Sequence, residues 1–412
     1  MLKTITALGL IAVMSLCTRN EKPSLQQQLA EIASGANFSG AMLVAFNNQI
    51  LVDTAYGFAD DDRSIRNTAS TIFPIASITK LFVKQAFFLL ADQGKVKLTD
   101  TLVHYCQCTR FASQITIADL LHHTSGLPDI HNRMPEFVNP WQLNKAVAAS
   151  DLFEKIDSCD SLLFAPGTQQ SYSNSNYLVL AHLIEIITGE TLDVFLQENL
   201  FQPYQMISTG LYAEHSHLAG HAQGFYVRNH EAVYLPDFNF TNFWGSGNAY
   251  STTSDLYNYA LKSQKEADAE WRGMLVQHSG YYLGYRSYFK TIPEIGLVII
   301  ILANNGDFMM PLFTDPVFDY IVSGLPKMEP TEVDKKRAGI YVAHRLGEEI
   351  QLMINSDGER LLVDETPLLK IDTNIFLMYN RDLTVVHFYD TSTKRSAILN
   401  DNGQIFHFVK TE

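Results

Sequence analysis

The pattern of apolar and polar residues changes near position 325 and divides the chain into two regions. In the first region, apolar residues recur at helical spacing in several stretches, such as 24–34 and 177–189. A hairpin pattern covers 41–46 and 49–56, and a nearly continuous apolar run at 295–302 fits a strand buried on both faces. We therefore predict one antiparallel sheet, built from the early hairpin and the late strands, with helices packed against it.

The second region begins at residue 338 and consists of short alternating segments separated by hairpin turn signals. These segments predict strands at 350–355, 361–364, 375–379, 383–389, 396–400 and 404–410. Between the regions, 325–337 holds two Pro and several charges, which is typical of a linker. The predicted fold class is α+β: an antiparallel sheet flanked by helices with an inserted helical region over 24–324, then a small all-β domain over 338–412.

The chain begins with one positive charge and a short apolar segment, which is the layout of a signal peptide and too short to span a bilayer. Cys17 follows directly and resembles the lipidation site of a bacterial lipoprotein, although Leu16 stands where a small residue is usual. We expect export to the periplasm or cell envelope, with residues 1–17 as the signal and lipid attachment of Cys17 to a membrane as one outcome. The other outcome is an ordinary cleaved signal, with Cys17 removed or incidental.

Composition and cysteine usage narrow the classes of partner. The net charge of -14 argues against a nucleic-acid partner, because phosphate binding needs clustered Lys and Arg. Export would permit one disulfide among Cys106, Cys108 and Cys159, and their spacing does not choose the pair. A Cys-x-Cys sequence without a second pair is a poor zinc site.

One short motif carries nucleophilic chemistry. Ser77-x-x-Lys80 precedes an apolar run, 81–91, so both side chains share one face at the start of a predicted buried helix. A Ser hydroxyl needs a neighbouring base, and a desolvated Lys with a pKa well below its usual ~10.4 can be that base. The helix N-terminus adds backbone N–H groups that favour developing negative charge. The alternative is a Ser cap on a core helix with a surface Lys, and the tetrapeptide alone does not decide.

Three further segments follow in the same order as in a known family: 121–128, Tyr172-Ser173-Asn174 and His278-Ser279-Gly280. Together with the first motif they resemble the serine β-lactamase and penicillin-binding-protein superfamily. The branch with the greatest resemblance is the class C β-lactamase-like group, with its D,D-peptidase, D-aminopeptidase and esterase relatives. The resemblance covers residues 24–324, and it implies a β-lactamase/transpeptidase-like fold with no metal or organic cofactor. The all-β domain is similar to the small barrel-like domain appended to many such hydrolases.

The resemblance implies a role for each matching residue. Ser77 would be the acylated nucleophile and Lys80 would hold the charge network and share the duty of base. Tyr172 would take the Ser77 proton and later activate the deacylating water. Asn174 would hydrogen-bond Lys80 and the substrate amide. The oxyanion hole would be formed by the backbone N–H groups of Ser77 and Tyr281.

The third motif departs from the β-lactamase pattern, because His278 stands where a Lys helps to bind the substrate carboxylate. A His is mostly neutral at pH 7, and esterase-like and peptidase-like relatives commonly carry one at this place. Ser279, Gly280 and Tyr281 complete the expected substrate-binding strand. Asn304 falls at the end of the late strand and is a further candidate for substrate binding, with a strand-end turn as the alternative.

We therefore expect a serine hydrolase that acts through an acyl-enzyme on small-molecule or peptide-like esters and amides rather than on β-lactams. One alternative is a β-lactamase or D,D-carboxypeptidase proper. Another is a binding or sensor protein that keeps the fold, although the intact catalytic motifs argue against it. A third is a metal-dependent hydrolase using His215, His217 and His221, where the lack of a Cys, Asp or Glu at ligand spacing favours a surface loop.

Overall fold

The computed structural model describes residues 23–60, 62–131, 134, 145–212, 220–235, 239–266, 273–325, 328–379, 382–390, 395–401 and 404–411. The predicted signal segment 1–17 with Cys17, and also His215 and His217, lie outside these ranges. Within them, no helix has both the length and the apolar character needed to cross a membrane. The same residues contain no group of three His, Cys, Asp or Glu side chains that could hold a metal ion.

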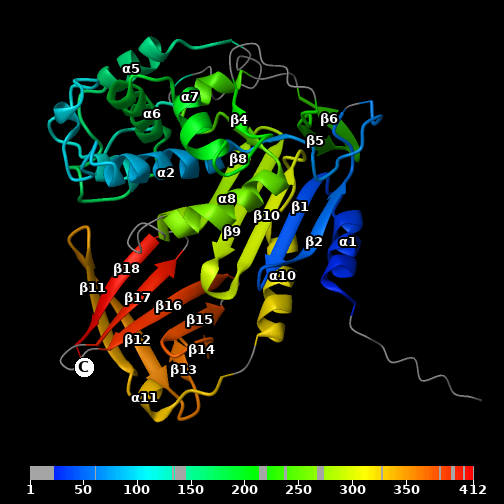
Figure 1. Ribbon diagram of the computed structural model, residues 1–412, viewed down its shortest axis with the longest axis vertical. Helices are drawn as coiled ribbons and strands as arrows, with labels where there is room; N and C mark the ends of the chain where they lie inside the picture. Colours follow the sequence, from blue (N-terminus) through cyan, green and yellow to red (C-terminus); the bar gives the residue numbers. More distant parts are fainter. Residues whose placement is uncertain are drawn as a thin grey trace, which may run out of the picture.

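A five-stranded antiparallel sheet forms the centre of the first region (Figure 1). The predicted pairing of early and late strands is confirmed, because β1 pairs with β10 from Gly40↔Ala303 to Ala45↔Val298. Every residue of β10 is buried, as its continuous apolar run predicts. In this sheet β8 is an edge strand. The strand order is β2 (Gln49–Tyr56), β1 (Gly40–Phe46), β10 (Leu297–Ala303), β9 (Tyr285–Ile292) and β8 (Gln277–Tyr282).

Helices cover both faces of this sheet. On one face, Leu29 and Phe313 from two helices share an apolar core with Ile301 of β10. On the other face, a larger core joins Leu302 of β10 to three helices that belong to the inserted helical region or follow it. The helices of the first face are α1 (Leu25–Gly35) and α10 (Pro311–Gly324), and those of the second are α2 (Thr79–Asp92), α6 (Asn174–Thr188) and α8 (Thr253–Glu266).

Short elements complete the first region, and Figure 1 shows the helices α2, α5, α6 and α7 gathered beyond one end of the sheet. A small sheet consists of β3 (Phe73–Pro74), β7 (Ala249–Ser251) and β4 (Gly210–Leu211), and a hairpin of β5 (Phe225–Arg228) and β6 (Glu231–Tyr234). Among the described residues of this region, the other α-helices are α3 (Ile117–Leu121), α5 (Ala149–Asp157) and α7 (Leu192–Leu196). Single turns are η1 (Ala76–Ile78), η2 (Leu102–His104), η4 (Gln197–Phe201), η5 (Phe240–Phe243), η6 (Gly273–Leu275) and η7 (Pro293–Ile295).

Two boundaries differ from the sequence-based expectation, and a third feature concerns a proline inside a helix. Ser77 lies in the 3₁₀ turn η1, and the α-helix itself begins at Thr79. The helix predicted from position 177 begins at Asn174, so the second motif includes its first residue. Pro316 lies inside α10, within its second turn, rather than limiting where the helix begins.

The second region is a closed barrel of eight antiparallel strands, two more than the pattern predicted. The linker also contains a short helix, α11 (Glu332–Lys335). The two additional strands are β11 and β14; β11 pairs with both β12 and β18 and so closes the barrel. The strands are β11 (Gly339–Arg345), β12 (Glu348–Ser356), β13 (Leu361–Val363), β14 (Thr366–Lys370), β15 (Ile375–Tyr379), β16 (Leu383–Asp390), β17 (Arg395–Asp401) and β18 (Gln404–Lys410).

A cluster of buried charges lies where α11 meets the barrel. Asp334 accepts from the Arg337 guanidinium at 2.7 Å and from the Lys370 ammonium at 2.6 Å. Arg337 also lies over the ring of Phe388, 4.9 Å from the centroid. Asp334 thus forms ion pairs with two buried cations, and these pairs connect the linker to the barrel wall.

The barrel contacts the α10 face of the central sheet. Leu377 and Val385 of the barrel belong to the same apolar core as β10. The buried Lys290 ammonium on β9 donates to Asp382, in the turn before β16, at 2.5 Å and to Gln277 of β8 at 2.9 Å. These contacts connect the barrel directly to the edge strand.

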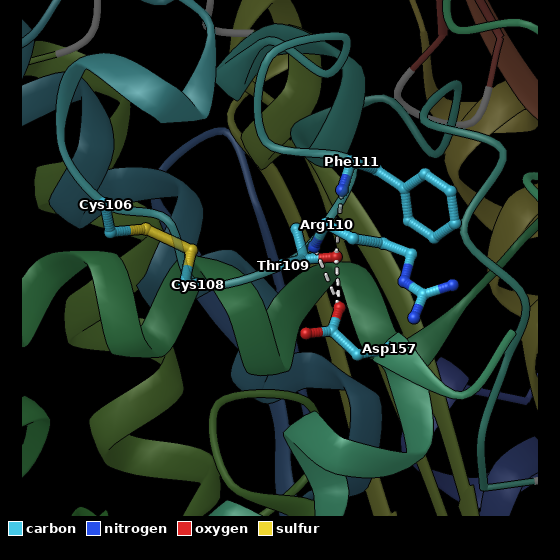
Figure 2. Close-up of a disulfide and its surroundings, with 6 residues drawn as sticks. All are labelled: Cys106, Cys108, Thr109, Arg110, Phe111 and Asp157. Atoms are coloured by element: carbon cyan, nitrogen blue, oxygen red, sulfur yellow. Dashed lines mark hydrogen bonds between the residues drawn. A yellow bond between two sulfur atoms is a disulfide. The ribbon is translucent and has the colours of Figure 1, made fainter.

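Cys106 and Cys108 form a disulfide in the loop after η2, which resolves the choice that their spacing left open (Figure 2). The residues that follow are held by Asp157 at the end of α5. Its carboxylate accepts from the Thr109 hydroxyl and the Arg110 backbone N–H, both at 2.9 Å. The disulfide therefore lies in a loop that is hydrogen-bonded to the end of α5.

Candidate active site

Ser77 is presented by a turn that the surrounding strands hold in place. The preceding residue, Ala76, has φ 47°, a left-handed conformation that is uncommon for a residue with a side chain. The Ala76 carbonyl accepts from the Thr79 hydroxyl at 2.7 Å, and the Ile75 carbonyl accepts from the Ser287 hydroxyl at 2.7 Å. The tertiary structure thus fixes the conformation that exposes the Ser77 hydroxyl at the start of α2.

The Lys80 side chain is fully buried, and its amine lies against the Ser77 hydroxyl. Its Nζ lies 3.1 Å from Ser77 Oγ, and it donates to Asn174 Oδ1 at 2.8 Å and to the Ser246 carbonyl at 2.5 Å. Burial lowers the pKa of Lys80 well below its usual value; the Asp129 carboxylate opposes this shift and Lys84 adds to it. The environment therefore favours the neutral amine of Lys80.

The Tyr172 hydroxyl lies on the other side of the nucleophile and donates to Ser77 Oγ at 2.9 Å. Its ring is half exposed and stacks on His123 with centroids 4.5 Å apart. Burial of the hydroxyl end raises the pKa of Tyr172, and the hydrogen bond to Ser77 offsets part of that shift. At neutral pH this side chain is therefore a protonated phenol.

His278 faces the Lys80 side of β8. Burial, with smaller contributions from Lys84 and Lys80, lowers the pKa of His278 to about 3, so its ring is neutral throughout the physiological range. Its Nδ1 lies 2.7 Å from the Ser279 carbonyl, which fixes the proton on that nitrogen because a carbonyl only accepts. The side chain therefore brings no positive charge to the surroundings of Ser77.

Gly280 allows β8 to pass directly beside the nucleophile turn. A Cβ there would lie 2.5 Å from the Ile75 carbonyl oxygen and 3.0 Å from the Ala76 Cβ. Side chains alternate along a strand, so Ser279 and Tyr281 point to the opposite, α10-facing side of the sheet. The expected substrate-binding strand thus lies beside Ser77. Its backbone edge faces Ser77, but the side chains of Ser279 and Tyr281 do not.

Asn304 does not face the cleft. Its side chain is fully buried and donates to the carbonyls of Phe58 and Gln223, at 3.0 and 2.8 Å, and accepts from Asn67 at 3.3 Å. These contacts account for the whole amide group. They correct the expectation of substrate binding and give Asn304 the alternative role, that of joining the end of β10 to its neighbouring loops.

Three groups at the site were not singled out from the sequence for a catalytic role. Asp129 accepts from Asn174 Nδ2 at 3.1 Å, so it orients the amide whose oxygen accepts the hydrogen bond from Lys80. His123 accepts the Ser173 backbone N–H at 3.2 Å and supports the Tyr172 ring. The third is the Ser246 carbonyl. The segment 121–128 and the Gly-rich turn at 244–247 were the available signals, but neither specified which atoms reach the site.

Comparison with known proteins identifies the family to which the chain belongs. A family model described as Beta-lactamase matches residues 25–274. The chain is 25% identical over 456 residues to "Penicillin-binding protein 4*" of Bacillus subtilis, covering 96% of this chain and 100% of that protein. It is 24% identical over 300 residues to "Teichoic acid D-alanine hydrolase" of Staphylococcus aureus, covering 72% of this chain and 71% of that one.

The solved structures agree at the level of the fold. The crystal structure of D-amino acid amidase from Ochrobactrum anthropi matches with a TM-score of 0.63 and 20% identity, covering 73% of this chain and 98% of that chain. The fold and the matching family model define a hydrolase of the serine β-lactamase and penicillin-binding-protein superfamily. The chain belongs to the β-lactamase family.

Proposed function

We propose that the protein is a serine hydrolase that forms an acyl-enzyme on Ser77 and acts on esters or amides of amino-acid-like acyl groups. The observation that supports this most directly is the position of the Ser77 hydroxyl. It lies 3.1 Å from a buried lysine amine and 2.9 Å from a tyrosine hydroxyl. Both distances permit proton transfer without rearrangement.

The opposite pKa shifts suggest how acylation proceeds. Neutral Lys80 takes the proton from Ser77 Oγ as this oxygen attacks the carbonyl carbon of the substrate. The bond from that carbon to the leaving oxygen or nitrogen then breaks, and the Tyr172 hydroxyl gives its proton to the leaving group. Lys80, now an ammonium ion 5.0 Å from the centroid of the Tyr172 ring, stabilises the phenolate that results.

Deacylation returns both protons. The Tyr172 phenolate takes a proton from water, and the hydroxide formed attacks the acyl carbon. The bond to Ser77 Oγ then breaks, and this oxygen recovers its proton from Lys80. The cycle consumes one water molecule, releases the acid and the leaving group, and restores the starting protonation of all three side chains.

The oxyanion hole in this proposal consists of the backbone N–H groups of Ser77 and Tyr281. Its support is the close packing of β8 against η1, which the absence of a side chain at Gly280 makes possible. Both donors belong to backbone fixed by the sheet and the turn, so they need no reorganisation when negative charge develops on the substrate oxygen.

The neutral His278 supports esters or amides over β-lactams as substrates. A protein with a lysine at this place would offer a charge to the substrate carboxylate, and a neutral imidazole offers none. Similar proteins are named for D-amino acid amide and teichoic acid D-alanine hydrolysis, and one is described as a hydrolase with promiscuous acyltransferase activity. We therefore propose p-nitrophenyl esters and D-alanyl amides as better substrates than nitrocefin.

Covalent labelling tests the mechanism. Intact-mass analysis after treatment with a fluorophosphonate or a fluorescent penicillin should show one adduct, which is absent in Ser77→Ala. Ser323→Ala, at an exposed serine on α10, should label normally and serves as the matched control. If neither probe forms an adduct while substrate analogues still bind, the fold has been kept for binding and the proposal fails.

We also propose that the protein is exported, with residues 1–17 as the signal and Cys17 as a lipid-attachment site. This rests on the sequence of that segment alone. Radiolabelled palmitate should enter the protein in cells and be absent from Cys17→Ala. A mature N-terminus found at another residue, without lipid, would support ordinary signal cleavage instead.

A further inference from the structure

A cavity of about 480 Å³ lies on the face of the sheet opposite to Lys80. Its walls are the α10-facing side chains of β8 and β9, the first turns of α10 and the turn before β16. Ser279 and Tyr281, which flank Gly280, open into this cavity. Its volume falls within the roughly 300–1,000 Å³ range of small-molecule sites.

One wall of the cavity carries a guanidinium group with unused donors. Arg286 is paired with Tyr281 across β9 and β8, and its Cζ lies 4.0 Å from the centroid of the Tyr281 ring. Its Nε donates to the Gly306 carbonyl at 3.0 Å. Its two terminal nitrogens have no acceptor among the residues that the structure describes. The stacking and the single anchor therefore orient four N–H groups that remain free for an anion.

The α10 side of the cavity carries a carboxylate that has no cationic partner among the described residues. Asp315 on α10 forms no ion pair with any described lysine or arginine, and it accepts a hydrogen bond from the Thr314 hydroxyl at 3.5 Å. Asp382, another carboxylate that lines the cavity, is by contrast paired with Lys290. Arg286 and Asp315 thus face one cavity with opposite charges that do not reach each other.

We propose that this cavity binds a small zwitterion of the amino-acid class, with its carboxylate on Arg286 and its ammonium group on Asp315. Phe318 and Tyr288 supply an apolar surface for the side chain of the ligand. The site is separate from Ser77 and Lys80, and its occupancy does not require turnover.

Calorimetric titration of the Ser77→Ala protein tests this, with phenylalanine of either hand as the probe. Phenylalanine should bind saturably, and both phenylalanine amide, which lacks the carboxylate, and N-acetylphenylalanine, which lacks the ammonium group, should bind at least 10-fold more weakly. Arg286→Gln should weaken phenylalanine by about 10-fold and leave the amide unchanged. Asp315→Asn should weaken phenylalanine similarly and leave the N-acetyl compound unchanged.

Two matched variants provide the controls. Arg228→Gln removes a guanidinium that is already paired with Asp307, and Asp319→Asn removes a carboxylate one turn further along α10, which accepts from Tyr379. Both should bind phenylalanine as the Ser77→Ala parent does. Wild-type protein labelled at Ser77 with fluorophosphonate should also bind it, which separates this cavity from the active site.

The proposal is overturned if no saturable binding is found at millimolar phenylalanine. Binding of the amide or of the N-acetyl compound as tight as that of phenylalanine itself would overturn it as well, and this probe series gives a result even if a pocket variant does not fold. Loss of binding after fluorophosphonate labelling would place the ligand at Ser77 and also contradict the second site.

Discussion

Lys80 is the residue whose environment most limits the chemistry of the site. It is fully buried, yet it lies within hydrogen-bonding distance of the nucleophile and is surrounded by acceptors. Desolvation destabilises its charged form, and the Asp129 carboxylate partly restores it. The balance between these two effects sets the pH at which a neutral amine becomes available.

This balance predicts a pH dependence. If neutral Lys80 is the base, kcat/KM for a p-nitrophenyl ester should rise with pH through the lowered pKa of Lys80 and then reach a plateau. Asp129→Asn removes the group that raises this pKa, so the rising limb should move to lower pH, whatever happens to the plateau height. A limb near the unperturbed ~10.4, or one that Asp129→Asn leaves in place, would count against Lys80 as the base.

His278 offers a test of substrate choice at the same scale. The pKa of His278 is lowered to about 3, so titration of this ring should cause no change in kcat/KM between pH 5 and 8. His278→Lys introduces a charge that a substrate carboxylate can use. We expect the ratio of nitrocefin to ester turnover to rise by about 10-fold, or 1.4 kcal/mol. An unchanged ratio would show that the third motif does not set this preference.

The sequence predicted much of the residue-level arrangement, because the three motifs have a fixed order and each marks an element terminus. Ser77, Lys80, Tyr172 and Asn174 meet as expected. The contribution of the Ser246 carbonyl could not be read, since any residue has a carbonyl and only the folded backbone directs one to Lys80. The prediction that Asn304 binds substrate failed for a related reason. The sequence does not show in which direction a side chain at the end of a strand points, and the Asn304 side chain is buried.

At the scale of elements, the contact between β8 and the nucleophile turn is the sensitive point. Gly280→Ala would force the strand away from Ile75, because the added Cβ lies only 2.5 Å from that carbonyl oxygen. We expect a loss of about 1–3 kcal/mol in stability and roughly 100-fold in kcat/KM, since small displacements of positioned groups are costly. Thermal melting and ester kinetics measure the two effects.

Gly35→Ala at the end of α1 is the matched control, because a Cβ there meets no atom within 4 Å. Its melting temperature and kinetics should stay close to those of the wild type. If Gly280→Ala behaves like Gly35→Ala, the strand and the turn have room to separate without consequence, and the proposed oxyanion hole loses its structural support.

Element prediction succeeded where the apolar pattern was unambiguous, as in the hairpin of β1 and β2 and in the buried β10. Length alone did not decide the outcome, because the three-residue β13 was predicted while the seven-residue β11 and the five-residue β14 were missed. The linker was described by its Pro and charged residues, and its capped helix α11 was not anticipated. Short elements depend on tertiary packing, which local sequence does not encode.

At the scale of the whole molecule, the buried charge cluster at Asp334 decides how firmly the barrel is held. Burial raises the pKa of this carboxyl, but hydrogen bonds from Lys370 and Thr331 outweigh it and lower the pKa below its usual 3.8. Its contribution to stability is therefore complete above that usual value and is lost as the pH falls through the lower, folded-state pKa.

Asp334→Asn would leave two buried cations without a carboxylate and should cost about 3–5 kcal/mol. All three tryptophans, at 141, 244 and 271, precede the barrel. Urea unfolding of this variant should therefore show a circular-dichroism transition that comes before the fluorescence transition. Glu332→Gln, which breaks an exposed pair with Lys335, should unfold within about 0.5 kcal/mol of the wild type. Coincident, unshifted transitions in Asp334→Asn would contradict the prediction.

The pairing of β1 with β10 also sets how much of the chain must be made before the central sheet can form. β1 ends at Phe46, but its partner begins only at Leu297, so about 250 residues must be made before the two strands can meet. At roughly 5–20 residues per second, that interval lasts on the order of tens of seconds. During this time Ser77 and Lys80 already exist in the nascent chain, but the strand that completes their site does not. The central sheet beside the motif residues therefore stays incomplete until nearly three quarters of the chain has been translated.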